Sequence, residues 1–523
     1  MMESSLLLSE VEGGFTIKYK GGYLYPSLHP RQSIERKADN FTLLDNTLYI
    51  IPSPLLWYGI QNLLDKLPVH SYLLIVEREP LLLELSHQYA ITDKRILFCS
   101  GSEYPGDLAI LEHFPKTHLR HAKVLSLNGG YRLNKTWYQE RQEQLQKGIN
   151  HFWKNKMTLI HMGRAWISNI FKNLQKIPDS RILESWHSNI PMVIVGAGES
   201  LEHSLPVIQQ IRNKVFLLAV DTALPILAAA QLRPDAILAL ESQFYNLYDF
   251  YGSLDLDIPI IADISSYPPL LRYYKGPKYF ITSHFASIDL LIRIKSNAIA
   301  SFDIPPLGSV GVAALWFAQY LSKGPIFVSG FDFAYKRGKS HAKEAPGHKL
   351  LLNQHTRFVN LGNYEAAINR PFLSMMDKNG NICNSDLILE GYRNNFFALC
   401  EKSDNVYDLS NMGLDLGIPQ VSTTEVINIL WDYPVRDYTL PHHQVPISQE
   451  TISTFINLER KRINNLIDSI TSKDNNKIDT LLAELDYLYC FFPDEPWKGL
   501  YPPGFLSRVL AAANYFRQQL GLL

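Results

Sequence analysis

The fold of this 523-residue chain is decided by the stretch Met192-Val193-Ile194-Val195-Gly196-Ala197-Gly198-Glu199-Ser200-Leu201. Four apolar residues predict a buried strand, the glycines predict a tight turn, and the residues up to Arg212 predict a helix. Glycines let the backbone approach a phosphate closely, and the Ser200 hydroxyl and the free N–H groups at the helix start supply donors. An ordinary strand-to-helix turn also favours glycine. A phosphate site is therefore one of two interpretations of these residues.

Six further apolar runs follow this stretch, most of them separated by helical segments. They are Val215–Val220, Ala236–Leu240, Pro259–Ala262, Tyr279–Thr282, Ile326–Ser329 and Asn405–Asp408. Alternation of buried strands with helices is typical of an open, doubly wound parallel sheet. The sequence therefore predicts an α/β fold with a central Rossmann-like domain.

The regions on either side have different patterns. Towards the N-terminus, Phe15–Lys20 alternates as a hairpin strand does, and three later apolar runs at helix-length spacing predict parallel strands: Thr47–Ile51, Ser71–Glu77 and Arg95–Cys99. Apolar residues at helical spacing and without proline predict one or two long helices from about Asn134 to Lys176, and helical spacing returns after about Val421.

These patterns predict four parts. Residues 1–135 form an N-terminal α/β domain, 136–185 a helical linker, 186–425 the central α/β domain and 426–523 a C-terminal helical domain.

Composition excludes some classes of partner. Fifty basic and 51 acidic residues leave a formal charge of -1, so no overall field favours nucleic acid. The four cysteines lie far apart, without the close pairs of structural zinc sites. The longest apolar stretch, residues 215–232, contains Asp221 and Pro225 and makes a poor membrane span. The first residues lack a signal peptide's positive region, so we expect a cytoplasmic protein. No metal site is predicted.

Polar side chains follow two of the predicted strands. Asp221 and Thr222 come after one strand, and Glu241 comes after the next. Because open parallel sheets bind ligands at the carboxyl ends of their strands, we expect these side chains at a common crevice. Helix capping is the alternative role for a polar residue at such a position.

Two later segments add candidate site residues. Gly308-Ser309-Val310 opens an apolar helix, either as a second anion cradle or only to let helices pack closely; both interpretations stay open. Gly330, Asp332 and Tyr335 follow the strand Ile326–Ser329, and the polar loop after them carries His341.

Together these motifs resemble the motility-associated factor (Maf) proteins, a family of flagellin glycosyltransferases related to the archaeal MptE-like pterin diphosphokinases. The matching motifs, in order, are Gly196–Leu201, Asp221-Thr222-Ala223, Arg233-Pro234-Asp235 with Glu241, Gly308-Ser309-Val310, Gly330–Tyr335 and Ser340-His341-Ala342. The glycine turn and Ser329-Gly330-Phe331-Asp332-Phe333 are also similar to bacterial sialyltransferases. The motif series covers about 230 residues.

The resemblance implies transfer of a sialic-acid-like sugar, such as pseudaminic or legionaminic acid, from its CMP ester to serine or threonine of flagellin. No tightly bound cofactor is implied. The implied donor-site residues are Gly196, Gly198, Ser200, Asp221, Thr222, Glu241, Gly308, Ser309, Val310 and Gly330. The catalytic residues would be His341 as base, Asp332 as an alternative acid, base or orienting group, and Tyr335 to assist phosphate departure. His284 and His348 are rivals for the base.

The chain departs from the resemblance at several places. Glu199 stands where relatives usually have proline, and its charge would repel a phosphate unless it points away. The segment Ile382–Asp386 lacks the histidine of the sialyltransferases. In the N-terminal domain, prolines in Ile51–Gly59 replace a glycine-rich turn, although Glu77 sits where a ribose-binding acid is expected; we predict a structural or protein-binding role there.

Two other functions are compatible with the central domain. One is a magnesium-dependent diphosphokinase passing pyrophosphate from ATP to a pterin. The other is a flagellin-binding or assembly factor that kept the fold without the chemistry.

Overall fold

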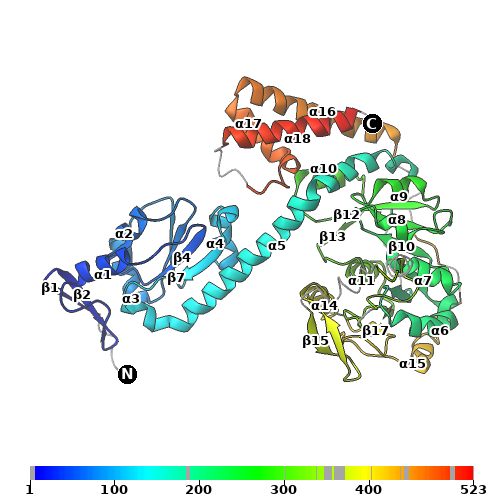
Figure 1. The fold of residues 1–523 in the computed structure, drawn as a ribbon, viewed down its shortest axis with the longest axis horizontal. Helices are drawn as coiled ribbons and strands as arrows, with labels where there is room; N and C mark the ends of the chain where they lie inside the picture. Colours follow the sequence, from blue (N-terminus) through cyan, green and yellow to red (C-terminus); the bar gives the residue numbers. More distant parts are fainter. Residues whose placement is uncertain are drawn as a thin grey trace. The chain divides into compact units, whose positions relative to one another are not determined.

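The computed structural model of the chain describes residues 6–183, 189–300, 302–336, 339–346, 356–358, 372–401, 403–435, 438–440, 447–494 and 501–521. The chain folds into two compact units. Unit 1 comprises Met1–His161 and Phe491–Pro502, and unit 2 comprises Met162–Cys490 and Pro503–Leu523 (Figure 1). The four-part division made from the sequence stays a prediction.

Unit 1 contains two sheets. A small antiparallel sheet is formed by β1 (Leu7–Val11), β2 (Gly14–Tyr19) and β3 (Gly22–Tyr23). In the larger sheet, all neighbours are parallel and the order is β6-β5-β4-β7. Its strands are β4 (Thr47–Pro52), β5 (Tyr72–Glu77), β6 (Ile96–Ser100) and β7 (His121–Val124). The three parallel strands expected from the sequence are confirmed.

Both faces of this parallel sheet are buried. Along β4, Tyr49 and Ile51 pack into one apolar cluster, whereas Leu48 and Ile50 pack into another. This follows from the period of two in a strand, and it requires helices on both faces. The helices of unit 1 are α1 (Pro30–Asp39), α2 (Ile60–Asp65), α3 (Pro80–Gln88), α4 (Asp107–His113) and the first part of α5 (Lys135–Leu174).

The described residues of unit 2 form an eight-stranded parallel sheet in the order β13-β12-β11-β10-β9-β8-β14-β17. The strands are β8 (Met192–Val195), β9 (Phe216–Val220), β10 (Ala236–Ala239), β11 (Ile260–Asp263), β12 (Lys278–Ser283), β13 (Asp303–Ile304), β14 (Ile326–Ser329) and β17 (Val406–Asp408). The predicted α/β class and open parallel sheet are therefore confirmed.

The order of the strands reverses once. From β8 the chain moves outward through β9 to β13, and then returns to place β14 on the other side of β8. The loops that leave β8 and β14 consequently lie side by side at the carboxyl ends of adjacent strands. This point, where the strand order changes direction, is where open α/β sheets bind ligands.

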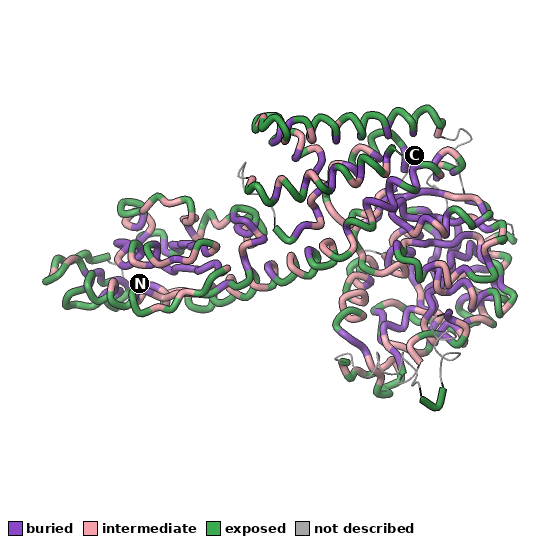
Figure 2. The backbone as a smooth tube through the Cα atoms, turned by 45° about the horizontal axis from the view of Figure 1, so that its top comes forward, coloured by how far each residue is buried: buried purple, intermediate pink, exposed green. Residues whose placement is uncertain are grey.

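The helices of unit 2 cover this sheet. In Figure 2 its central strands are buried, and the residues of β8, β9 and β14 have almost no exposed surface. The apolar helix α11 packs against β8, β9, β10 and β13. The helices of this part are α6 (Leu201–Ile211), α7 (Leu224–Ala229), α8 (Asn246–Asp249), α9 (Pro268–Tyr273), α10 (Asp289–Ser296), α11 (Val310–Leu321), α14 (Leu387–Cys400) and α15 (Thr423–Ile429). A hairpin of β15 (Leu373–Met376) and β16 (Ile382–Ser385) precedes α14.

Three helices complete unit 2: α16 (Gln449–Ser472), α17 (Asn475–Glu484) and α18 (Pro503–Gly521). The segment expected as one or two long helices forms the single 40-residue helix α5. Near its end, the Asn173 side-chain amide donates to the backbone oxygens of Ile264 and Ser266, each at 2.8 Å. Among the described helices, none has the length and apolarity needed to cross a bilayer.

Candidate functional site

A cavity of about 540 Å³ lies where the strand order of the large sheet reverses. The loops after β8 and β14 form one part of its wall, and the starts of α11 and α14 form another. Of the residues predicted from the sequence, those that line it are Gly196, Gly198, Thr222, Ser309, Val310, Gly330, Asp332, Tyr335 and His341. Residues as much as 196 positions apart in the sequence thus meet at one site, from Gly196 to Tyr392.

The glycines of the first loop are required by a close contact between two loops. A side chain at Gly196 would place its Cβ 2.6 Å from the backbone oxygen of Gly330. A side chain at Gly198 would place its Cβ 2.7 Å from the Asp332 carboxylate. Gly330 also has a φ of +76°, which favours glycine. Packing of the two loops therefore explains these glycines without a ligand.

Several N–H groups of the turn are already bonded within the protein. Gly196 N donates to Ser329 O at 2.8 Å, and Gly198 N donates to Gly330 O at 3.0 Å. The Ser200 hydroxyl accepts from Gly330 N at 3.1 Å and from the Ser410 hydroxyl at 3.0 Å. Ser200 is fully buried and is not part of the described cavity wall. The expectation that its hydroxyl faces a phosphate is corrected, because that hydroxyl joins the loops.

Asp332, in the loop after β14, accepts a hydrogen bond from the glycine turn. Its Oδ2 atom accepts a hydrogen bond from Ser200 N at 3.0 Å, and it is 6% exposed. Its Oδ1 atom is buried without a hydrogen-bond partner among the described residues. Burial raises the pKa of the Asp332 carboxyl, an effect that the bond from Ser200 opposes. A buried, incompletely bonded carboxylate is costly for folding, and such groups concentrate at functional sites.

The N-terminus of α11 forms part of the cavity wall. Ser309, Val310 and Gly311 line the wall, and the Ser309 side chain caps the helix by accepting from Gly311 N at 3.3 Å. The first N–H groups of a helix lack partners within the helix and carry a partial positive charge. Gly308 has a φ of +78° and packs behind the wall on the Tyr392 ring. Gly308 thus serves close packing, and an anion-binding role for the helix start stays a prediction.

The loop after β14 places the candidate proton-transfer groups. His341 is exposed at the cavity, with its Nδ1 atom 3.1 Å from the Ser340 hydroxyl. Tyr335 is held by a backbone bridge to Asn384 and contributes to the same wall. The rival His284 lies 3.4 Å from Asp303 and is not in the described wall, and His348 lies outside the described residues.

Of the polar residues at the strand ends, Thr222 lines the cavity, and Asp221 and Glu241 lie outside its described wall. Thr222 reaches the cavity, while Asp221 lies behind it at 3% exposure and accepts from Thr222 N at 2.8 Å and from the Asn246 amide at 2.7 Å. Burial raises the pKa of Asp221 to about 6. Glu241 is exposed and accepts from Gln243 N at 2.9 Å. Asp221 and Glu241, which were expected to contact the donor, do not belong to the described wall of the cavity, and their carboxylates bond to neighbouring residues.

Glu199 points towards lysines. Its Oε1 atom lies 3.3 Å from the ammonium groups of both Lys336 and Lys339. It does not belong to the described wall of the cavity. Two lysines therefore offset the charge of this carboxylate outside the described wall.

The cavity is also lined by residues that were not proposed as site residues from the sequence, among them Phe331, Phe333, Asp386 and Tyr392. Asp386 caps α14 by accepting from the backbone N–H groups of Ile388 and Leu389 at 2.8 and 2.9 Å. An acid followed by apolar residues is a helix-start signal, so the cap was detectable, but its place at the cavity was not.

Comparison with known proteins supports the same fold. Residues 167–338 match the family model described as 6-hydroxymethylpterin diphosphokinase MptE-like. An uncharacterized protein of Treponema pallidum (strain Nichols) is 28% identical over 546 residues, covering 98% of this chain and 94% of that protein. A second uncharacterized protein of that organism is 27% identical over 99 residues, covering 18% of this chain and 44% of its own.

A solved structure is similar over almost the whole chain. It is the MAf glycosyltransferase from Magnetospirillum magneticum AMB-1, with a TM-score of 0.57 over 98% of this chain and 86% of that one. At 13% identity, the likeness is one of fold. The chain thus contains a region similar to the MptE-like family within a fold similar to that of a Maf glycosyltransferase.

Proposed function

We propose that this protein is a glycosyltransferase that moves a nonulosonic acid, such as pseudaminic or legionaminic acid, from its CMP ester to serine or threonine of flagellin. The observation that carries the proposal is the cavity between the glycine turn and the start of α11, at the reversal of the strand order. The similarity of fold to a Maf glycosyltransferase supports it. In this proposal the reaction takes place in the cytoplasm, before the acceptor is exported.

The start of α11 is the proposed phosphate position. Ser309, Val310 and Gly311 at the start of this helix line the cavity, and a helix start favours an anion. The glycine turn keeps the two loops close enough to form the opposite wall, which Asp332 fixes through Ser200 N. Thr222 would contact a nucleotide or sugar hydroxyl, held in place by Asp221.

The proposed reaction exchanges one bond for another at the anomeric carbon. The bond from this carbon to the CMP phosphate oxygen breaks, and a bond to the acceptor hydroxyl oxygen forms. CMP leaves with the electron pair, so stabilising its phosphate and positioning the acceptor are the main requirements. His341 takes the acceptor proton because it is exposed at the cavity and an ordinary histidine titrates near neutral pH. In this scheme Asp332 is a positioning residue, and Tyr335 assists the departing phosphate.

A diphosphokinase is the alternative to be separated, because residues 167–338 match a model named for that activity. Binding to the folded protein raises its stability, so nucleotides can be compared by thermal unfolding. We expect CMP to raise the melting temperature and ATP with magnesium to leave it unchanged. The reverse result would favour the diphosphokinase.

The decisive test is the intact mass of flagellin from a strain lacking this protein. The proposed function predicts loss of a mass increment equal to a nonulosonic acid, and its return when the gene is restored. An unchanged flagellin mass would refute the proposed acceptor. Incubation of purified protein with CMP-nonulosonate and unmodified flagellin then tests whether the protein itself performs the transfer.

A further inference from the structure

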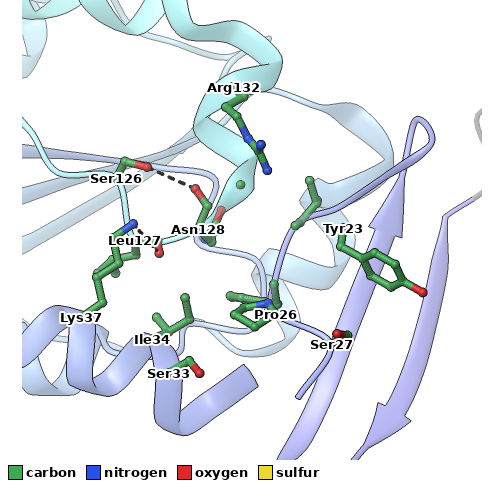
Figure 3. Close-up of a pocket in the computed structure, with 13 residues that line it drawn as sticks. Tyr23, Pro26, Ser27, Ser33, Ile34, Lys37, Ser126, Leu127, Asn128 and Arg132 are labelled. Atoms are coloured by element: carbon green, nitrogen blue, oxygen red, sulfur yellow. Dashed lines mark hydrogen bonds between the residues drawn. The ribbon is translucent and has the colours of Figure 1, made fainter. Parts of the chain in front are cut away.

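A second cavity, of about 570 Å³, lies within unit 1. Its wall comes from α1, from the segment after β3 and from the loop after β7 (Figure 3). In the parallel sheet of this unit, the chain runs outward from β4 to β6 and then returns to place β7 on the other side of β4. The loop after β7 therefore leaves the sheet at its own reversal point, where α/β sheets bind ligands.

The other loop at this reversal point is filled by the protein. After β4, Leu55 and Trp57 are buried at 0% and 4% exposure, and the Trp57 indole donates to Ser86 O at 2.7 Å. Both residues have positive φ values, of 54° and 58°, which non-glycine residues rarely adopt. The usual phosphate position of such a domain is thus occupied, and the open space lies on the β7 side.

The open side is positively charged. Two basic residues, Lys37 and Arg132, contribute to the described wall, which contains no aspartate or glutamate. Figure 3 shows them extending into this region from opposite sides. Gly129 leaves space for the Arg132 guanidinium, because a Cβ there would lie 2.9 Å from it. Within the described chain, that guanidinium has no hydrogen bond or ion pair.

The Lys37 ammonium group makes one hydrogen bond to the protein and can donate further ones. Its Nζ atom donates to Leu127 O at 3.1 Å, which leaves two of its three N–H groups for a ligand. Burial lowers the pKa of Lys37, which disfavours its charged form. An anion beside the ammonium group would favour the charged form again. Ile34 and Leu127 are buried beside it, giving an apolar floor.

We infer that this cavity binds a small phosphorylated metabolite, with its phosphate between Lys37 and Arg132 and its less polar part over Ile34 and Leu127. Arginine and lysine side chains that lack an acidic partner are the groups that bind phosphate in proteins. The volume is within the range of small-molecule sites. This site is separate from the cavity of unit 2 and does not depend on the proposed function.

The test is calorimetric titration of the full chain with sodium pyrophosphate at constant ionic strength. We expect saturable binding that Arg132→Gln and Lys37→Met each weaken about tenfold or more, since each removes a charge-assisted hydrogen bond. Arg36→Gln is the matched control, because Arg36 is exposed on the same helix but is not part of the described wall. This control should bind as the unaltered protein does.

Hydrogen exchange identifies the cavity that is occupied. Pyrophosphate should protect backbone amides of residues 126–132 in the unaltered protein and not in Arg132→Gln. Arg132 is exposed, so its replacement should leave the fold intact even if Lys37→Met does not. Absence of saturable binding, or binding unaffected by Arg132→Gln, would overturn the inference. Citrate binding more tightly than pyrophosphate at the same residues would overturn the assignment to phosphate.

Discussion

His341 is the residue on which the proposed chemistry depends. Replacing it with glutamine should lower kcat about 100-fold or more and leave KM nearly unchanged, because general-base catalysis contributes about that factor. The acid limb of the pH–rate profile should disappear as well. Steady-state transfer assays measure both effects.

The control is His203→Gln, which changes an exposed histidine on α6 outside the described cavity wall. Transfer that survives His341→Gln unchanged would remove this histidine from the base role.

Asp332 combines a structural bond with a buried charge. Burial raises its pKa in the folded protein, so its charged form reduces stability as pH rises from the ordinary aspartate range through that raised value. Asp332→Asn keeps an acceptor for Ser200 N and removes the charge, so it should be at least as stable as the unaltered protein at neutral pH. Asp332→Ala should lose about 1–3 kcal/mol, because Ser200 N is left buried without its partner. Chemical denaturation of the two variants checks this order.

Glu77 gives unit 1 a pH-dependent stability. Burial raises the pKa of its carboxyl to about 7, although hydrogen bonds from the Ser53 and Ser86 hydroxyls act to lower it. Because the pKa of Glu77 is higher in the folded state, its contribution to the free energy of unfolding is most favourable below about pH 4.5. This contribution declines by about 3 kcal/mol in all as the pH rises to about 7. Glu77→Gln should flatten this decline. Hydrogen exchange of β5 amides across pH, corrected for intrinsic rates, is the measurement, and an equal decline in the variant would contradict it.

At the scale of elements, one ion pair joins α10 to α16. The Arg293 guanidinium contacts both carboxylate oxygens of Glu459 at 2.7 and 3.0 Å, and Glu459 is fully buried. Arg293→Met leaves that carboxylate buried with Arg462 as its remaining cation, so we expect a loss of about 3 kcal/mol. Denaturant unfolding measures the loss.

Lys461→Met, at an exposed position of α16, is the control and should change stability little. The double replacement Arg293→Met with Glu459→Met should recover part of the loss, since it removes both buried charges. A double variant as unstable as the single one would show that the lost packing of Arg293, and not its charge, is responsible.

Strands that are buried on both faces could be predicted from sequence, and the others could not. Met192–Val195 and Ile326–Ser329 are continuous apolar runs, and both form strands with the predicted bounds. By contrast, β7, with its histidine and lysine, and the two-residue β13 have no such run. These segments form strands because neighbouring strands supply their backbone hydrogen-bond partners. Those partners are distant in the sequence, so the local pattern does not reveal them.

For the whole molecule, separate cores predict unfolding in more than one step. The apolar clusters of unit 1 and of unit 2 are built from different residues. Scanning calorimetry should therefore give a calorimetric enthalpy larger than the van't Hoff enthalpy. CMP should shift only the transition of unit 2, because the proposed donor cavity lies entirely within that unit. Equality of the two enthalpies would contradict independent cores.

The α/β class and nine of the cavity residues could be predicted from the sequence, because buried parallel strands and glycine turns are local patterns. What each residue contacts depends on the folded chain. In the folded chain the Ser200 hydroxyl bonds to Gly330 N and to the Ser410 hydroxyl, and Glu199 pairs with two lysines. The start of α11 lines the cavity. A polar group's role depends on which partners it contacts, and these partners lie 130 to 210 residues away in the chain.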